Sequence, residues 1–284
     1  MRLVRKINLS KKQLLALYVF LLAFLLTRFI GLRTDAINPD GVNWHYRSQQ
    51  FVVGLKSGDF TKTYQHYHPG VTLMWITGIP IEIYKQITGI QFYDQLNFLD
   101  FHFIARSSLI VTQLFLALII LYFLSSILKY EKALLILSLL SFEPFFVGNS
   151  RLYHMDGIFT LLVFLGLILL YTYYKTEKLY HLVLIGVVSA LVFLTRSLGL
   201  GLFVYSLLVV GYTCYRSGKY KNLLVLTLAF IAATFLLFPA LWVDPIHYLS
   251  EIFSEGERVG IRKGHSQIFF GESTKNPGFL FYPV

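Results

Sequence analysis

Residues 14–30 read LLALYVFLLAFLLTRFI, a run that is almost entirely apolar and long enough for a membrane-spanning helix. Five basic residues precede it: Arg2, Arg5, Lys6, Lys11 and Lys12. No small-residue cleavage pattern follows the run, so it is predicted to be an uncleaved first span rather than a signal peptide. The basic residues 1–13 should stay in the cytoplasm, which places the next segment of the chain outside.

The composition of the whole chain is that of a multi-pass membrane protein. Of its 284 residues, 56% are hydrophobic and only 14% are charged, whereas a soluble domain carries about a quarter charged residues. The net charge of +10 could suggest a nucleic-acid-binding protein. The basic residues instead lie in short breaks between apolar runs, which predicts a lipid bilayer as the partner and no nucleic acid.

Seven apolar runs predict an all-α polytopic domain over residues 14–241. The predicted spans are 14–30, 107–128, 133–149, 157–174, 181–195, 197–215 and 222–241. Basic residues in the breaks at 129–132, 175–178 and 216–221 would all lie on the side of the N-terminus, as the positive-inside rule requires.

Two segments are predicted to lie outside the membrane. The first is a large outer loop, 32–106, in which residues 71–90 are apolar but interrupted by proline and charged residues, so an interfacial helix is expected there. The second is 242–284. Its apolar end has no span behind it, which suggests that the chain is part of a longer protein.

The outer loop opens with a helix start at Asn38-Pro39-Asp40, because Asn caps helices well and Pro suits the first helical position. If the helix continues, two groups of residues take separate faces: Asp40, Asn43, Arg47 and Gln50 on one, and Val42, Tyr46 and Val53 on the other. The Asp40 carboxylate could accept a proton from an attacking hydroxyl. Acidic residues are also common in first turns, so a purely structural role stays open.

The loop continues with YQHYHPG, residues 64–70. Pro69 favours an extended conformation at His68, so His66 and His68 would point the same way. The two imidazoles could contact an anion, hold a divalent metal or pack at the membrane interface. As metal ligands they are a weak pair, because a catalytic zinc usually has about three protein ligands.

Other charged residues lie in the remaining outer segments. Arg151 and Asp156 share the next outer break, where they could simply pair with each other. Arg258, Arg262 and His265 give the last segment a basic patch. This patch could bind a lipid phosphate or make general contacts with anionic headgroups.

The order of these segments resembles that of polyprenyl-phosphate-dependent glycosyltransferases with the GT-C fold. Among them, the protein O-mannosyltransferase and lipid A aminoarabinose transferase-like families are the most similar. The motifs that carry the resemblance are NPDGVNWHYR at 38–47, YQHYHPGVTLMW at 64–75 and NSRLYHMDGIFTLLVFLGL at 149–167. One departure concerns metal binding: the aminoarabinose transferase type has an acidic–basic pair before the proline, where this chain has Tyr67-His68.

The resemblance implies a GT-C-type helix bundle whose outer loop bears interfacial helices. It implies transfer of a hexose-type sugar from a polyprenyl phosphate to a hydroxyl of an acceptor protein, lipid or glycan at the outer face of the cell membrane. Asp40 would be the general base and Asp156 the second carboxylate. Phosphate contacts would come from Arg47, His66, His68, Arg151, Arg258, Arg262 and His265. A divalent metal at His66 and His68 is the one cofactor that the pattern leaves open.

Two other functions stay open on the sequence. A transporter or lipid flippase could use Glu143 and Arg196, which lie near spans, although no two-fold repeat is visible. A non-catalytic membrane assembly subunit would use the outer loops for docking, and it would tolerate neutral substitution of Asp40 and Asp156.

Overall fold

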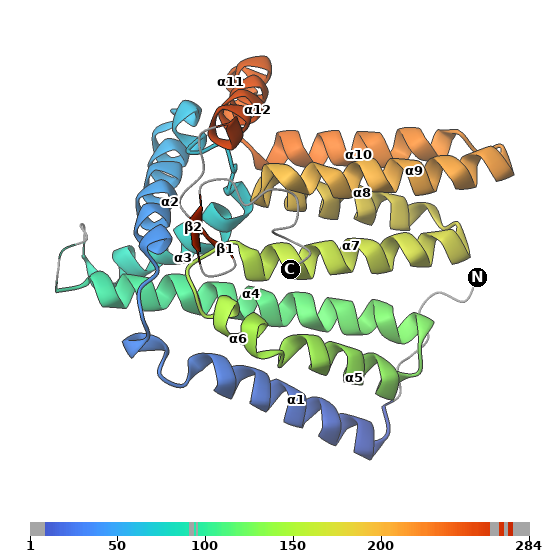
Figure 1. Cartoon of the computed structure of the whole chain (residues 1–284), viewed down its shortest axis with the longest axis horizontal. Coiled ribbons are helices and arrows are strands. Elements are labelled where there is room, and N and C mark those ends of the chain that lie inside the picture. Colours follow the sequence, from blue (N-terminus) through green and yellow to red (C-terminus); the bar gives the residue numbers. More distant parts are fainter. Residues whose placement is uncertain (1–8, 91–93, 95, 262–266, 270–271, 275–284) are drawn as a thin grey trace.

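The computed structural model describes residues 9–90, 94, 96–261, 267–269 and 272–274. Within them, most of the helices lie side by side as a bundle, and the others gather at one of its ends (Figure 1). The α-helices are α1 Lys11–Phe29, α2 Pro39–Ser57, α3 Val71–Thr88, α4 Phe98–Ile127, α5 Tyr130–Ser141, α6 Pro144–Ser150, α7 Asp156–Thr176, α8 Leu179–Thr195, α9 Leu200–Ser217, α10 Lys221–Leu237, α11 Ala240–Val243 and α12 Pro245–Ile261. Short 3-10 turns cover Leu32–Thr34, Phe60–Thr63 and Ser197–Gly199, and β1 Gln267–Phe269 pairs with β2 Glu272–Thr274 in an antiparallel hairpin.

Several of these helices are long and apolar enough to cross a membrane. Four qualify individually: Lys11–Thr34, Phe98–Ile127, Asp156–Thr176 and Ser197–Ser217. The bent pair of α5 and α6 would make a fifth, while α8 and α10 are apolar but shorter. A largely helical, membrane-embedded protein, as the composition predicts, is therefore what the described residues form.

Two of the predicted spans differ in detail from the structure. Residues 133–149 were predicted as one span, and the chain bends by 65° within it, between α5 and α6. Pro144 cannot continue the α5 helix, and the Glu143 carboxylate instead caps α6 by accepting from the N–H groups of Phe145 and Phe146. The second difference is at α4, which begins at Phe98 rather than 107.

The early start of α4 has a local cause. The Asp94 side chain accepts from the backbone N–H groups of Leu96 and Asn97, both at 2.9 Å, and so sets up the first turn. The polar residues that hydropathy assigns to a loop then lie within the helix. His102 and Arg106 are both almost fully buried, because their side chains face neighbouring segments of the bundle.

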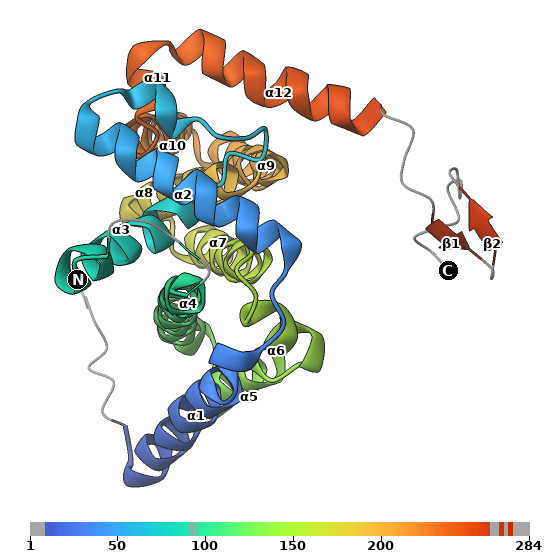
Figure 2. The same ribbon diagram turned by 90° about the vertical axis from the view of Figure 1, so that its left-hand side faces the viewer.

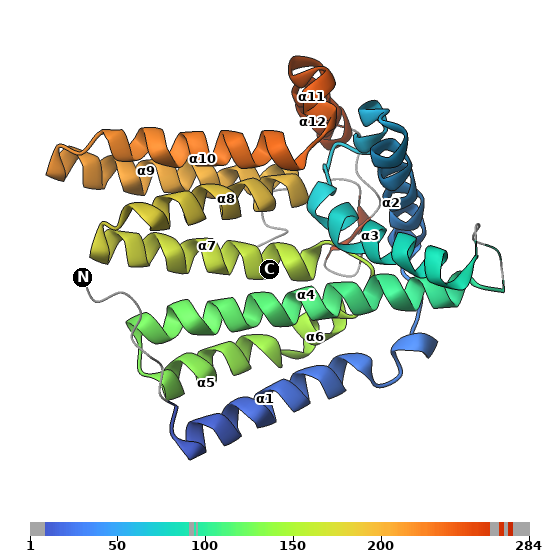
Figure 3. The same ribbon diagram turned by 180° about the vertical axis from the view of Figure 1, so that it is seen from behind.

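The long helices alternate in direction, so the loops divide between the two ends of the bundle. The start of α1 and the breaks at 128–129, 177–178 and 218–220 lie at one end (Figures 1 and 3). The loops around 64–70, 151–155 and 196–199 lie at the other, where α2 and α12 cross the bundle (Figure 2). We call these the basic end and the loop end.

The helix α2 has three faces rather than the two that spacing predicts. The polar and apolar faces named from the sequence are both at the surface; Asp40, Val42 and Tyr46, for example, are exposed. A third face packs onto the protein and carries Trp44, His45, Ser48, Phe51 and Val52. The helix is thus held at the loop end with its charged face outward.

Candidate functional site

The candidate site is a group of charged side chains that separate loops bring together at the loop end. Asp40 lies in the first turn of α2, where its N–H donates to the Asn38 side chain at 3.0 Å. Asp156 is the first residue of α7, and His154 comes from the connection just before it. Arg196 occupies the break between α8 and α9.

His154 stands between the two carboxylates. Its Nδ1 lies 3.1 Å from Asp156 Oδ2, and its Nε2 lies 3.7 Å from Asp40 Oδ2. On the far side, Arg196 Nη1 donates to Asp156 Oδ1 at 2.8 Å. Asp156 is therefore engaged from both sides, while the Asp40 side chain is 62% exposed to solvent.

Arg47 lies about two turns beyond Asp40 on α2, and the two groups interact electrostatically without forming an ion pair. Arg47 is half-buried, with its guanidinium 4.6 Å from the centre of the Trp44 ring. Among the residues that the structure describes, no carboxylate lies within salt-bridge distance of it. An arginine stacked on an indole but without an acidic partner is available to an incoming anion.

His66 and His68 lie close to this group, and both are neutral at pH 7. Burial lowers the pKa of each imidazole to about 4, and nearby arginines add to the shift: Arg47 for His66, and Arg196 with Arg47 for His68. His66 Nδ1 accepts the backbone N–H of His68 at 3.2 Å. The pair can thus offer hydrogen bonds to an anion but adds no positive charge.

The backbone of the histidine loop is fixed by Gly70. This residue has φ +61°, and a Cβ atom there would lie 2.2 Å from Trp44 Cη2, so only glycine fits. Its N–H donates to the carbonyl of Thr195 at 3.3 Å, next to Arg196. Gly70 therefore joins the histidine loop to α2 and to the α8–α9 break.

A buried hydroxyl network holds α2 against the His154 loop. The Tyr153 hydroxyl lies 2.8 Å from both Ser48 Oγ and Thr77 Oγ1. Burial raises the pKa of Tyr153 to about 12, so the phenol stays neutral and shares its proton with these oxygens. Because Tyr153 precedes His154, the network positions the histidine between the two carboxylates.

An apolar cavity of about 250 Å³ lies beside the charged group. Its lining includes Val71, directly after Gly70, as well as Ile158, two residues after Asp156, and Leu194, two residues before Arg196. Hydrocarbon bound there would lie next to the charged side chains.

The remaining predicted site residues lie elsewhere or outside the described part. Arg151 Nε contacts Asp35 Oδ2 at 2.8 Å, and its Nη1 donates to the Thr27 carbonyl at 2.8 Å, so it secures the end of α1 rather than pairing with Asp156. Arg258 on α12 is exposed and pairs with Glu255. Arg262 and His265 lie outside the described residues.

The site does not supply a good metal-binding set. Among the described residues, no three or more His, Cys, Asp or Glu side chains are arranged to hold an ion. His66 and His68 form only a pair, and His66 Nδ1 already accepts a backbone hydrogen bond. These two donors do not fit a divalent metal.

Comparison of the chain with protein-family models, curated proteins and solved structures found no match.

Proposed function

We propose that the chain is a membrane glycosyltransferase that moves a hexose-type sugar from a polyprenyl phosphate to an acceptor hydroxyl at the loop end. The observation that carries this proposal is the exposed Asp40 carboxylate, which lies about two turns before Arg47 on α2 and is linked to Asp156 through the imidazole of His154. The reaction needs a base, a cation for the leaving phosphate and a place for lipid. The charged group and the adjacent cavity offer all three.

Asp40 is the proposed general base. It takes the proton of the acceptor hydroxyl while the hydroxyl oxygen forms a bond to the anomeric carbon of the sugar. The bond from that carbon to the phosphate oxygen breaks, and its electron pair leaves with the phosphate. This single displacement is expected to invert the anomeric configuration.

The leaving phosphate gains negative charge, and Arg47 is the residue best placed to stabilise it. Its guanidinium is held on Trp44 before substrate arrives, so little reorganisation is needed during the reaction. His66 and His68 would donate hydrogen bonds as neutral imidazoles. Arg196 pairs with Asp156, so its proposed role is to position that carboxylate.

His154 and Asp156 are proposed as positioning residues. Asp156 lies within contact distance of the imidazole on one side and of Arg196 on the other, which fixes the orientation of the His154 ring. The ring in turn limits where the Asp40 carboxylate can lie. This arrangement gives the second carboxylate a role without requiring it to take a proton.

The orientation in the membrane follows from the distribution of charge. The basic residues of the short breaks at 129–132, 175–178 and 216–221 lie at the end of the bundle opposite the site, so we propose that this basic end is cytoplasmic and the loop end is on the outer face of the cell membrane. The acceptor protein, lipid or glycan would then approach from outside.

The residues on which a transport function would rest have local structural partners. Glu143 accepts two backbone N–H groups at the start of α6, at 3.1 and 2.6 Å, and Arg196 pairs with Asp156. Neither side chain needs a translocation path to explain it, so the enzyme is the function that the site supports best.

The test is sugar transfer from a panel of radiolabelled polyprenyl-phosphate hexoses, in membranes that contain the chain. Asp40→Asn should lower turnover by about 10²-fold or more, the usual effect of losing a general base. Asp59→Asn is the matched control, since Asp59 is a partly exposed carboxylate at the same end and bonds only to its neighbours Thr61 and Lys62.

The outcomes separate the candidate functions. Equal turnover in the two variants would remove Asp40 as the base. No turnover with any donor, in folded protein that still binds the lipid, would favour a transport or assembly function.

A further inference from the structure

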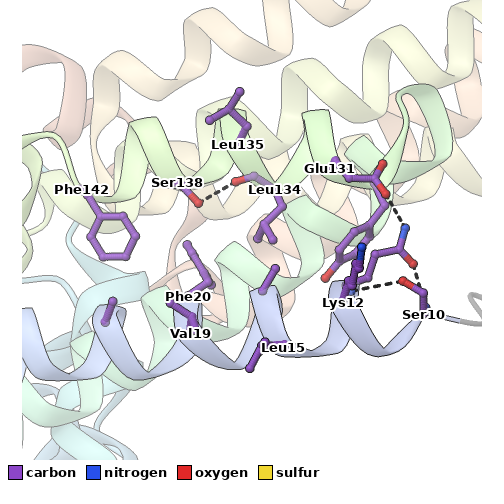
Figure 4. Close-up of a pocket in the computed structure, with 14 residues that line it drawn as sticks. Ser10, Lys12, Leu15, Val19, Phe20, Glu131, Leu134, Leu135, Ser138 and Phe142 are labelled. Atoms are coloured by element: carbon purple, nitrogen blue, oxygen red, sulfur yellow. Dashed lines mark hydrogen bonds between the residues drawn. The ribbon is translucent and has the colours of Figure 1, made fainter.

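A second site lies away from the charged group, in a groove between α1 and α5 (Figure 4). The groove has a volume of about 750 Å³. Its walls are mostly apolar: Leu15, Val19 and Phe20 come from α1, and Leu134, Leu135 and Phe142 come from α5 and its end. The helix α1 lies at the edge of the bundle, so one side of the groove is not covered by the described protein (Figure 2).

The polar groups of the groove are concentrated at the basic end. Five polar residues line that part of the groove: Ser10, Lys12, Gln13, Tyr130 and Glu131. Figure 4 labels Ser10, Lys12 and Glu131 among them. Gln13 Nε2 donates to Glu131 Oε1 at 2.6 Å and ties the two helices together. Ser138 lies further along, but its hydroxyl donates to the carbonyl of Leu134 at 2.7 Å. The groove thus has the polarity of an amphiphile, with a polar end and an apolar shaft.

The hydroxyl of Tyr130 is the second observation that points to a ligand. It is buried and has no hydrogen-bond partner among the described residues. A buried hydroxyl without a partner is costly, because it loses its hydrogen bonds to water and gains none. The hydroxyl is not accessible from the groove as it stands, but Tyr130 lines the groove, so a turn of its side chain would let the hydroxyl donate to an acceptor oxygen of a ligand there.

The charge at this end is positive. Four lysines lie in the first turns of α1 and α5 or directly before α5, against one carboxylate, Glu131: Lys11, Lys12, Lys129 and Lys132. Of these charged residues, Lys12 and Glu131 line the groove itself. Lysines at a membrane surface attract anionic headgroups. A ligand that accepts a hydrogen bond from Tyr130 is therefore expected to be an anion.

The groove also has the length of one leaflet. From Lys12 to Ala23 the helix advances 11 residues, or about 16 Å at the rise of an α-helix. That is about half of the roughly 30 Å hydrocarbon core. A partner helix would need a surface along the full span, whereas a lipid acyl chain needs only this half.

We propose that the groove binds one anionic phospholipid of the bilayer. Its acyl chain lies between α1 and α5, its phosphate lies near Lys12, and Tyr130 donates a hydrogen bond to a phosphate or ester oxygen. The hydrocarbon restores the dispersion contacts that an unfilled groove lacks. The lipid holds α1, which buries only Phe20, Phe24 and Arg28 in the protein, against the rest of the bundle.

The experiment uses the full chain in bilayers of equal phosphatidylglycerol and phosphatidylcholine, followed by gentle detergent extraction and native mass spectrometry. The wild type should retain about one phosphatidylglycerol and prefer it to phosphatidylcholine. Ala16→Trp should fill the groove and abolish retention. Leu22→Trp is the matched control, because Leu22 is an exposed residue of α1 outside the groove.

Charge variants test the headgroup contact without threatening the fold. Lys12→Gln should lower the preference for phosphatidylglycerol about fivefold, which corresponds to about 1 kcal/mol per lysine near a membrane surface. Lys221→Gln, at the start of α10 and the same end of the bundle, should not. Equal retention of both lipids by the wild type, or equal retention by Ala16→Trp and Leu22→Trp, would overturn the proposal. An effect of Lys12→Gln no greater than that of Lys221→Gln would overturn it as well.

Discussion

Replacing Gly70 by alanine should be far more damaging than replacing another glycine of the same conformation. Gly70 has φ +61°, and its added Cβ would lie 2.2 Å from Trp44 Cη2 and 2.3 Å from Trp44 Cζ3. Gly58, at the end of α2, has φ +74°, but no atom lies within 4 Å of the place that an added methyl group would take. At both positions alanine would have to adopt a positive φ, but only at Gly70 would its methyl group clash with a neighbouring side chain.

The magnitudes follow from these two terms. Holding alanine in the left-handed region costs about 1–2 kcal/mol at either position. Forcing a methyl group against a packed indole adds about 1–3 kcal/mol at Gly70 alone. Gly70→Ala should therefore lower the free energy of unfolding by about 2–5 kcal/mol, and Gly58→Ala by about 1–2 kcal/mol.

The assay is SDS titration of unfolding in mixed micelles, with transfer activity measured on the same samples. Activity should also fall in Gly70→Ala, because Trp44 supports Arg47 and the Gly70 N–H joins the loop to Thr195. Adding Trp44→Phe to Gly70→Ala should recover part of the stability, since the smaller ring makes room for the methyl group. Equal destabilisation by the two glycine variants would refute the close packing of Trp44 on Gly70.

Three further predictions concern the surroundings of the site. The free energy of unfolding should fall as the pH drops from about 6.5 towards 4. In this range His66 and His68 bind protons in the unfolded chain but not in the folded one, where their pKa values are about 4. In pH-dependent melting, a His66→Asn, His68→Asn variant should therefore show a shallower slope. Tyr153→Phe should cost only about 1–2 kcal/mol in an unfolding titration, because the two hydroxyls that it leaves are 3.1 Å apart and can bond to each other. Arg28→Gln should lower the free energy of unfolding by about 1.5–3 kcal/mol, since the buried Arg28 guanidinium donates to the Ser141 carbonyl at 2.6 Å. A smaller decrease than that of a variant at an exposed arginine would contradict this prediction.

Local signals predicted much of the fold. Each of the seven apolar runs is helical, because a long apolar segment in a bilayer must satisfy its backbone hydrogen bonds within itself. The start of α2 was also predictable, since Asn38 and Pro39 act through their own neighbours. Pro144 predicts a break in the helix, but hydropathy averaged over a window does not detect a single proline.

The candidate site was only partly predictable. The sequence indicated Asp40 and Asp156 but not the imidazole between them, although His154 lies two residues before Asp156. Arg196 stood out as a charge between two apolar runs, yet nothing local linked it to a carboxylate 40 residues away. The pairing of Arg151 with Asp156, which the sequence left open, is not formed; Arg151 pairs with Asp35 instead.

The sequence by itself determined that this chain is helical and membrane-embedded, and where most of its helices lie, because hydropathy and capping act over a few residues. Only the tertiary structure decided which charges meet. Asp40, His154 and Arg196 come from distant segments, and their distances depend on how α2, α7 and α8 pack. Contacts of that kind depend on side-chain volume across helix interfaces, such as the absence of a Cβ at Gly70, which no local pattern specifies.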